Sequence, residues 1–316
     1  MTTTTQWPTT ADGKYLVLRT VDADWRSRDG FRWYKTVETV APDWDPDPHR
    51  ECGGGLHGLL WGCGDVGLLS SDPDVVWLVV AVDPADMANP DQAHKVRFRA
   101  GQVRFHGTRG EAIDYLMGHG AAGLPVVYGR HSSGYKGSST SGYKGSSTSG
   151  DGGSSTSGYK GTSTSGYKGT STSGDWGSST SGYKGTSTSG DWGSSTSGYR
   201  GSSTSGDGGS STSGYKGTST SGHKGTSTSG DWGSSTSGYK GTSTSGDWGS
   251  STSGYRGTST SGDWGSSTAG YNGTLIITWH DGARYRRAVG YVGEGGLKPD
   301  TPYRVNERGE FVEVKS

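Results

Sequence analysis

The feature that most constrains this chain is an eight-residue repeat that fills Ser133 to Thr268. Seventeen octads follow one another without insertion or deletion, with the consensus Ser-Gly-(Tyr/Asp)-(Lys/Trp)-Gly-(Thr/Ser)-Ser-Thr, and a decaying eighteenth copy spans Ala269 to Ile276. Repetition at a fixed period is typical of architectures in which each repeat packs only on its neighbours. We therefore expect a solenoid over this stretch.

The alternative is a flexible linker, because Gly/Ser-rich segments with few apolar residues usually stay unfolded. Three features favour a folded array. It keeps its phase from the first octad to the last, and it places Tyr or Asp at the third octad position and Lys or Trp at the fourth. It also runs into strand-like sequence at both ends. Disorder is therefore the less favoured interpretation.

Each octad predicts one strand and one turn. The Thr-Ser-Thr or Ser-Ser-Thr end alternates and is β-branched, and the Gly-x-x-Gly part suits a turn. Thr162 and Thr164 then share one face of the strand, and Ser163 takes the other. We expect the Thr pair to face outward and the Ser inward. Such a thin core depends on hydrogen bonds between hydroxyls and backbone more than on apolar burial.

If each coil contains two octads, alternate octads lie on opposite sides of the rod. The rod is then about 40 Å long, at roughly 4.8 Å per rung. The Asp-Trp octads then lie on one side in the first half of the rod and on the other side in the second half. Stacked aromatic rows are predicted to mediate self-association. These rows consist of Tyr159, Tyr167, Tyr183, Tyr199, Tyr215, Tyr239, Tyr255, Trp176, Trp192, Trp232, Trp248 and Trp264.

The alternation GYKGTSTSGDWGSSTS, which begins at Gly182, resembles the tandem repeats of bacterial ice nucleation proteins. The resemblance covers the array alone, and it implies a β-solenoid whose Thr-x-Thr rows order water on a flat face. It also implies Tyr ladders where two rods pair. Three departures are a small Ser163 at the middle strand position, Lys, Arg or Trp at the fourth octad position, and a much shorter array. The implied water-ordering residues are Thr162, Thr164, Thr170, Thr172, Thr186, Thr188, Thr218, Thr220, Thr226, Thr228, Thr242, Thr244, Thr258 and Thr260.

Charge and hydropathy argue against several classes of partner. The 30 basic and 30 acidic side chains cancel, which does not favour binding to nucleic acid or an acidic membrane. No apolar stretch is long enough for a membrane-spanning helix. Met1 to Pro8 lacks the basic and apolar regions of a secretory signal. We expect synthesis in a cytoplasm, with assembly outside the cell or on a virion left open.

Residues 1–130 have an ordinary composition and predict an α+β head. The expected elements are strands at Tyr15–Val21, Phe31–Val40 and Val75–Val82, a hairpin over Lys95–Phe105, and a short helix at Gly110–Met117.

The one candidate for chemistry in this head is Cys52-Gly-Gly-Gly-Leu-His57, followed by Cys63. A zinc site would use these residues with His49 or His106, but the wide Cys–Cys spacing fits zinc poorly. A Cys52–His57 nucleophile pair lacks an orienting acid. The favoured interpretation is a buried thiol and a hydrogen-bonded His, so no metal, cofactor or catalytic residue is predicted.

Residues 277–316 predict a β-hairpin cap for the open last rung. A hairpin crosses Asp281-Gly282, and a second joins Thr301–Val305 to Glu310–Val314, with Leu275, Ile277, Trp279, Tyr291 and Phe311 as the apolar mass. The layout of head, repeats and cap resembles uncharacterised phage and bacterial small-residue repeat proteins. The Cys…Gly-Leu-His element and the closing phrase from Leu297 to Val314 carry that resemblance, which implies no known activity.

The sequence thus predicts a mainly β chain with three parts: an α+β head over 1–130, an octapeptide-repeat β-solenoid over 131–276 and a β-hairpin cap over 277–316. A non-enzymatic structural or assembly rod is the first-choice function, with the chain itself as partner in a homodimer or a larger assembly. Ice binding through the Thr-x-Thr face is the alternative, and adhesion to surfaces or carbohydrate is a lesser one.

Overall fold

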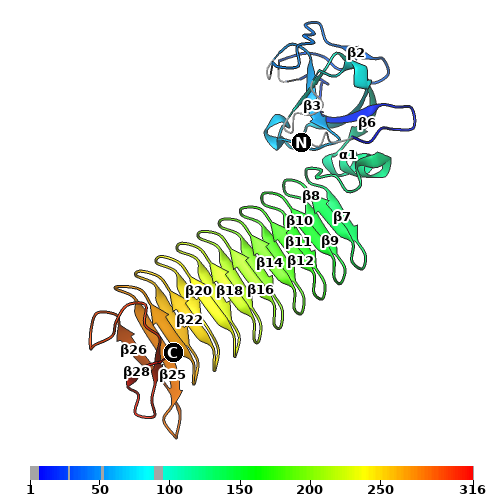
Figure 1. Cartoon of the computed structure of the whole chain (residues 1–316). Helices are drawn as coiled ribbons and strands as arrows, with labels where there is room; N and C mark the ends of the chain where they lie inside the picture. The colour runs from blue at the N-terminus through cyan, green and yellow to red at the C-terminus, as the bar shows by residue number, and fades with distance from the viewer. Residues whose placement is uncertain (1–6, 28, 51–52, 89–94, 316) are drawn as a thin grey trace. The chain divides into compact units, whose positions relative to one another are not determined.

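The computed structural model describes residues 7–27, 29–50, 53–88 and 95–315. These residues form two compact units (Figure 1). The first contains residues up to His131 together with Ser141–Gly145, and the second contains Ser132–Thr140 and Ser146–Ser316. The predicted division into three parts remains a prediction.

The first unit is built on a six-stranded sheet in the order β2-β6-β4-β1-β3-β5. Its strands are β1 (Tyr15–Val21), β2 (Thr39–Val40), β3 (Leu56–Leu60), β4 (Val76–Val82), β5 (Val96–Phe98) and β6 (Ala100–Gly107). The helices are η1 (Val66–Leu68), η2 (Pro84–Asp86), α1 (Arg109–Leu116) and η3 (Met117–Ala121). α1 begins with a capping box in which Thr108 and Glu111 bond each other's backbone N–H. The predictions for β1, for a buried central β4 and for α1 are confirmed.

Two predictions for this unit are wrong. The alternating stretch Phe31–Val40 forms an isolated bridge at Arg32 and the short strand β2, and between them the chain bends where the backbone N–H of Tyr34 bonds the hydroxyl of Thr39. The stretch Lys95–Phe105 is not a hairpin. β5 pairs with β3 while β6 pairs with β4 and β2, and only the bent residue Arg99 separates β5 from β6. β5 is the strand at one end of the sheet, and β6 lies next to β2 at the other end. Because β5 and β6 are nearly continuous in the chain, the sheet must curl.

The second unit is a β-solenoid with two facing parallel sheets. One sheet holds β8 (Ser138–Ser141), β10 (Ser154–Ser157), β12 (Thr170–Ser173), β14 (Thr186–Ser189), β16 (Ser202–Ser205), β18 (Thr218–Ser221), β20 (Ser234–Ser237), β22 (Ser250–Ser253) and β24 (Ser266–Ala269). The other holds β7 (Arg130–Ser133), β9 (Ser146–Ser149), β11 (Thr162–Ser165), β13 (Ser178–Ser181), β15 (Ser194–Ser197), β17 (Ser210–Ser213), β19 (Thr226–Ser229), β21 (Thr242–Thr244) and β23 (Thr258–Ser261). We call them the even and the odd sheet.

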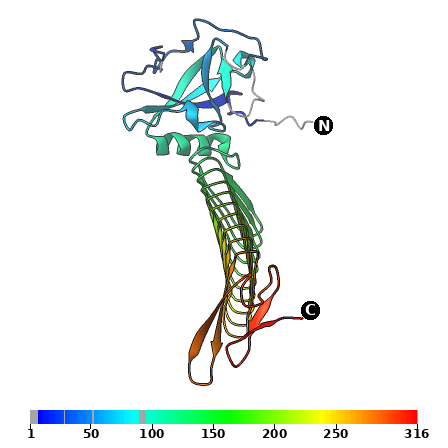
Figure 2. The same ribbon diagram turned by 90° about the vertical axis from the view of Figure 1, so that its left-hand side faces the viewer.

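The register of these strands confirms two octads per coil. Thr170 lies beside Thr186 in the even sheet, and Thr162 lies beside Ser178 in the odd sheet, so paired neighbours are two octads apart in the chain. Figure 2 views the coils from the side, where the two sheets form a narrow stack. The core between them is polar: the hydroxyl of Ser179 donates to the carbonyl oxygen of Ser171, across the core, at 2.6 Å.

The glycines of each turn are required by close approach between rungs. A Cβ at Gly190 would lie 2.0 Å from the Oδ1 atom of Asp175, and one at Gly185 would lie 2.8 Å from the carbonyl oxygen of Gly169. Neither glycine has a left-handed backbone. The left-handed residue is the one at the fourth octad position, such as Lys184 at φ 56° or Trp192 at φ 57°. That site of a β-turn usually holds Gly or Asn.

The C-terminal strands cover the last rungs. β25 (Thr274–His280) continues the odd sheet and pairs with β26 (Tyr285–Tyr291), while β27 (Tyr303–Val305) bonds β24 and pairs with β28 (Phe311–Glu313). Both predicted hairpins are present. Their core contains Ala269, Leu275, Val292 and Tyr303, with Phe311 packed against it. Tyr291 was expected in this core and is instead 54% exposed, because it lies on the outer face of β26.

Candidate functional site

The outer faces of the two sheets are surfaces of Thr and Ser hydroxyls. The sixth and eighth octad positions point outward and the seventh points inward. Thr162 is exposed and Thr164 is half-buried, whereas Ser163 is fully buried between them. The predicted Thr residues all lie on these outer faces, divided between the even and the odd sheet.

The eighth position forms a row of Thr that continues along each sheet. Thr156, Thr172, Thr188 and Thr204 are direct neighbours in the even sheet, and Thr148, Thr164 and Thr180 are neighbours in the odd one. The sequence-based set omitted the members of these rows that belong to Ser-Ser-Thr octads. The omitted residues are Thr140, Thr148, Thr156, Thr180, Thr196, Thr204, Thr212, Thr236, Thr252 and Thr268. The invariant Thr at the eighth position was the signal for them.

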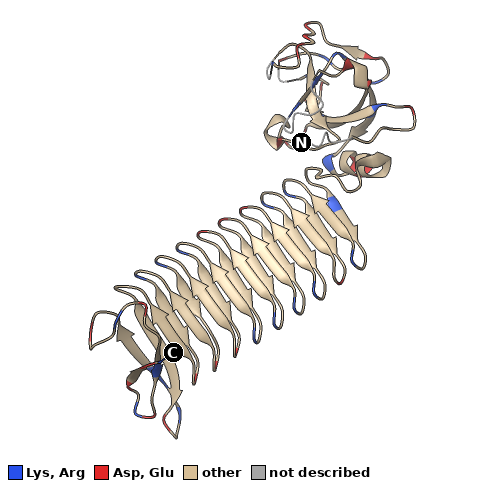
Figure 3. Cartoon of the chain, in the orientation of Figure 1, with Lys and Arg blue, Asp and Glu red and all other residues tan. Residues whose placement is uncertain are grey.

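Charged and aromatic side chains are kept off these faces. Figure 3 shows the strands of the solenoid free of charge between β8 and β24, with Lys, Arg and Asp confined to the turns. The third and fourth octad positions occupy the two central residues of each turn, as for Tyr183 and Lys184. Bulky residues at the fourth position therefore do not interrupt the hydroxyl rows.

The turns form two edges, which we name the first and second edge. The first edge contains the turns that lead from the odd to the even sheet, including those from Tyr167 to Trp264, and the second contains those that lead back. Rings stack along both edges. On the first edge the ring centroids of Tyr183 and Tyr199 are 5.0 Å apart, and those of Trp232 and Trp248 are 5.2 Å apart. On the second edge Trp176 stacks on Trp192 at 5.6 Å.

Every Tyr and Trp of the predicted aromatic rows lies on one of these two edges. The first edge holds Tyr167, Tyr183, Tyr199, Tyr215, Trp232, Trp248 and Trp264, and the second holds Tyr159, Trp176, Trp192, Tyr239 and Tyr255. Each of these first-edge rings is between 36% and 55% exposed, so the stack presents its rim to solvent. The expected change of side in the Asp-Trp octads is present: Trp176 and Trp192 lie on one edge, and the later Trp residues on the other.

Polar contacts link successive rungs along the edges. The Oδ1 atom of Asp175 accepts from the backbone N–H of Asp191 at 2.9 Å, and Asp247 accepts in the same way from Asp263. In the Tyr octads the cation lies over the ring that precedes it: the Nζ atom of Lys216 is 5.3 Å from the ring centroid of Tyr215 and 5.5 Å from that of Trp232. These interactions hold the charged groups at the rim of each edge.

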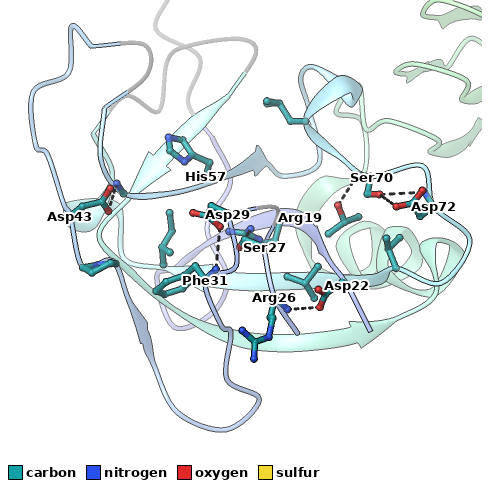
Figure 4. A pocket seen from close by; sticks show the side chains of 17 residues that line it. Arg19, Asp22, Arg26, Ser27, Asp29, Phe31, Asp43, His57, Ser70 and Asp72 are labelled. Carbon is teal, nitrogen blue, oxygen red and sulfur yellow. Dashed lines mark hydrogen bonds between the residues drawn. The ribbon is translucent and has the colours of Figure 1, made fainter. Parts of the chain in front are cut away.

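The first unit has a separate cavity of about 690 Å³ (Figure 4). Most of its acidic residues accept hydrogen bonds from backbone N–H groups of the surrounding loops. Asp22 accepts from the backbone N–H of Arg26, Asp29 from that of Phe31, and Asp43 from that of Gly55. Among the described residues no group of three or more His, Cys, Asp or Glu could hold a metal ion.

The predicted Cys–His element is only partly described. Cys52 lies outside the described residues. His57 reaches the cavity from β3, and burial, followed by the cations Lys95 and Arg19, lowers its pKa to about 4. Its Nε2 atom finds no hydrogen-bond partner in the described part of the chain, so the expectation of a hydrogen-bonded His is wrong there. Burial raises the pKa of the Cys63 thiol to about 12, which disfavours the reactive thiolate.

Within the described ranges, no helix is long and apolar enough to cross a membrane.

Comparison with known proteins places the repeat array beside one group. The chain is 32% identical over 113 residues to an ice nucleation protein of Xanthomonas campestris pv. translucens, and 32% identical over 103 residues to one of Pseudomonas fluorescens. It is also 28% identical over 110 residues to ice nucleation protein InaU of Pantoea ananas. These matches cover 33–36% of this chain and 7–10% of the relatives. No family model and no solved structure matches. The chain therefore carries a β-solenoid of two-octad coils whose repeats are similar to those of ice nucleation proteins.

Proposed function

We propose that the solenoid binds ice or orders water through the Thr rows of its two outer faces. The observation that carries this proposal is the continuity of those rows: each rung contributes the same outward Thr, and no charged side chain interrupts them. A methyl and a hydroxyl at every rung give a surface that is both weakly hydrated and able to donate and accept hydrogen bonds.

The spacing of the hydroxyls supports the same function. Outward positions such as Thr162 and Thr164 are separated by one inward residue, which is about 7 Å along a strand, and rungs repeat at roughly 4.8 Å. This regular grid is close to the spacing of oxygen rows in ice. The similarity to proteins named for ice nucleation is a second, independent support.

The solenoid also has the features of an assembly rod, and the edges favour this second function. Their stacked aromatic rings are about half exposed over several consecutive rungs, as for Trp232, Trp248 and Trp264. Contiguous exposed aromatic surface usually marks an interaction site. We infer that the edges associate with further copies of the chain outside the cell, and that the chain acts without catalysis.

Ice-affinity partitioning tests the first function. A slowly growing ice front is expected to incorporate the wild-type chain. Thr→Val substitutions along the central rows should abolish incorporation, because Val keeps the shape and loses the hydroxyl. The substituted positions are Thr172, Thr188, Thr204 and Thr220 in the even sheet, and Thr180, Thr196, Thr212 and Thr228 in the odd sheet.

The matched control changes the edges instead: Lys184→Gln, Arg200→Gln and Lys216→Gln should leave incorporation unchanged. Circular dichroism and the thermal midpoint must show that both variants remain folded. Rejection of the wild-type chain by ice, or equal incorporation of the Thr→Val variant, would overturn the proposal.

A further inference from the structure

The first edge carries two blocks of opposite charge. After a first turn with Lys136 and a second with Asp151, its successive turns hold Lys168, Lys184, Arg200 and Lys216, and then Asp231, Asp247 and Asp263. Figure 3 shows this change from blue to red turns along one edge, and a different order of blocks along the other. The blocks meet between Lys216 and Asp231, where Lys216 already lies over the ring of Trp232.

Opposite halves make this edge complementary to a reversed copy of itself. A two-fold axis between the rungs of Lys216 and Asp231 brings each cation opposite an anion at the same distance from the axis. The matched positions are Lys216 with Asp231, Arg200 with Asp247, and Lys184 with Asp263. The same operation sets Tyr215, Tyr199 and Tyr183 against Trp232, Trp248 and Trp264.

We propose that two copies of this chain pair antiparallel along their first edges, with the two-fold axis between the rungs of Lys216 and Asp231. This rests on the edge-to-edge association proposed above, and it specifies the edge, the direction and the register. Residue pairs that recur on both sides of an axis make an isologous contact, which closes as a dimer.

The second edge fits such a dimer less well. It also has an anionic block followed by a cationic one, and the two blocks meet between Asp207 and Lys224. Its aromatic row, however, is interrupted by Gly208 between Trp192 and His223, so the centre of the contact would lack a ring. The first edge has a ring at every rung from Tyr167 to Trp264, including the two rungs that flank the axis.

The two kinds of contact have different roles in the pair. The aromatic rims supply apolar burial and ring–ring contact, which carry affinity. Exposed ion pairs add little affinity, whereas like charges placed opposite each other disfavour the wrong register. We therefore expect a dimer with a micromolar dissociation constant, as for other narrow interfaces, that weakens as salt is added.

Exchange of dipeptides that already occur in the repeat tests the proposal without new turn chemistry. A cationic-edge variant carries Asp231→Tyr, Trp232→Lys, Asp247→Tyr, Trp248→Lys, Asp263→Tyr and Trp264→Lys. An anionic-edge variant carries Tyr183→Asp, Lys184→Trp, Tyr199→Asp, Arg200→Trp, Tyr215→Asp and Lys216→Trp. A double exchange combines both sets and reverses the order of the blocks. The matched control makes Asp175→Tyr, Trp176→Lys, Asp191→Tyr and Trp192→Lys on the second edge.

Sedimentation velocity of the full chain over a concentration series gives the outcome, with circular dichroism confirming the fold. Each single-edge variant should weaken dimerisation about tenfold or more, while a mixture of the two should form heterodimers. The double exchange should restore dimers, and the control should match the wild type.

The other outcomes separate the two levels of the proposal. A wild-type chain that is monomeric at every concentration would overturn edge-to-edge association altogether. Dimers that persist in both single-edge variants would leave association standing and overturn the first edge as its site. A parallel pair of one first edge and one second edge would match opposite charges in the wild type and would bring like charges together in the double exchange. A double exchange that fails to dimerise would therefore favour that pairing and overturn the antiparallel direction.

Discussion

At the scale of single residues, the solenoid core contains two kinds of buried Ser. At the seventh octad position many hydroxyls donate across the core, as Ser179 does to the carbonyl oxygen of Ser171, although those of Ser171, Ser187, Ser195 and Ser227 have no partner within the described residues. At the first position the hydroxyl of Ser181 is fully buried and has no hydrogen-bond partner within the described residues. The last rung places Ala269 at that same first position, with no exposed surface. The second hydroxyl is therefore dispensable for packing.

This difference predicts opposite effects for two neighbouring substitutions. Ser181→Ala should leave the free energy of unfolding unchanged or raise it, because it removes an unpaired buried polar group. Ser179→Ala should lower that free energy by about 1–2 kcal/mol, because it leaves the partner carbonyl without its donor. Urea denaturation followed by circular dichroism measures both. Equal losses from the two variants would show that Ser181 also bonds in solution.

At the scale of elements, the repeat was predictable because its information is local. Strand, turn and coil length each follow from a single octad, and the same octad recurs. Two elements of the first unit were mispredicted because alternation does not identify a pairing partner: Phe31–Val40 lacks one over most of its length, and β5 and β6 pair at opposite ends of one sheet. The full Thr rows are not apparent from the Thr-x-Thr pattern, because that pattern selects only the Thr-Ser-Thr octads, whereas each octad from Ser133 to Thr268 has a Thr at its eighth position.

The turn itself has an unexpected conformational demand. Its left-handed residue is Lys240 at φ 52° in one rung, whereas Gly208 and Asn272 occupy the equivalent site in others. A non-Gly residue in this conformation costs roughly 1–2 kcal/mol. The Nζ atom of Lys240 lies 5.3 Å from the ring centroid of Tyr239, which offsets part of this cost.

Two substitutions at this turn separate backbone strain from the cation–ring contact. Lys240→Ala removes the contact and keeps the strain, while Lys240→Gly removes both. We expect the Gly variant to be more stable than the Ala variant by about 1 kcal/mol. Thermal and urea midpoints at a low protein concentration measure the difference. A Gly variant that is less stable than the Ala variant would contradict left-handed strain at this position.

At the scale of the whole molecule, the order of charge along both edges depends on the spacing of the Asp residues in the repeat. From Asp175 to Asp207 and from Asp231 to Asp263, each Asp follows the previous one after two octads. A step of three octads separates Asp151 from Asp175, and a second one separates Asp207 from Asp231. Because a coil contains two octads, the second of these steps moves the Asp-Trp series from the second edge to the first. The extra octad therefore gives each edge its inverted halves.

Removal of that octad should change how copies assemble while leaving the coil intact. Deletion of Ser221–Thr228 places every later octad on the opposite edge, so the first edge becomes cationic from Lys168 onward and the second edge anionic from Asp175 onward. Like edges then repel, and unlike edges attract in a contact that does not close, so we expect open, concentration-dependent assemblies in place of dimers. Deletion of Ser213–Thr228 removes a full coil and keeps both edges inverted, so that control should still form dimers. Sedimentation velocity distinguishes the two, and dimers of equal stability from both deletions would show that the order of charge along the edges does not direct assembly.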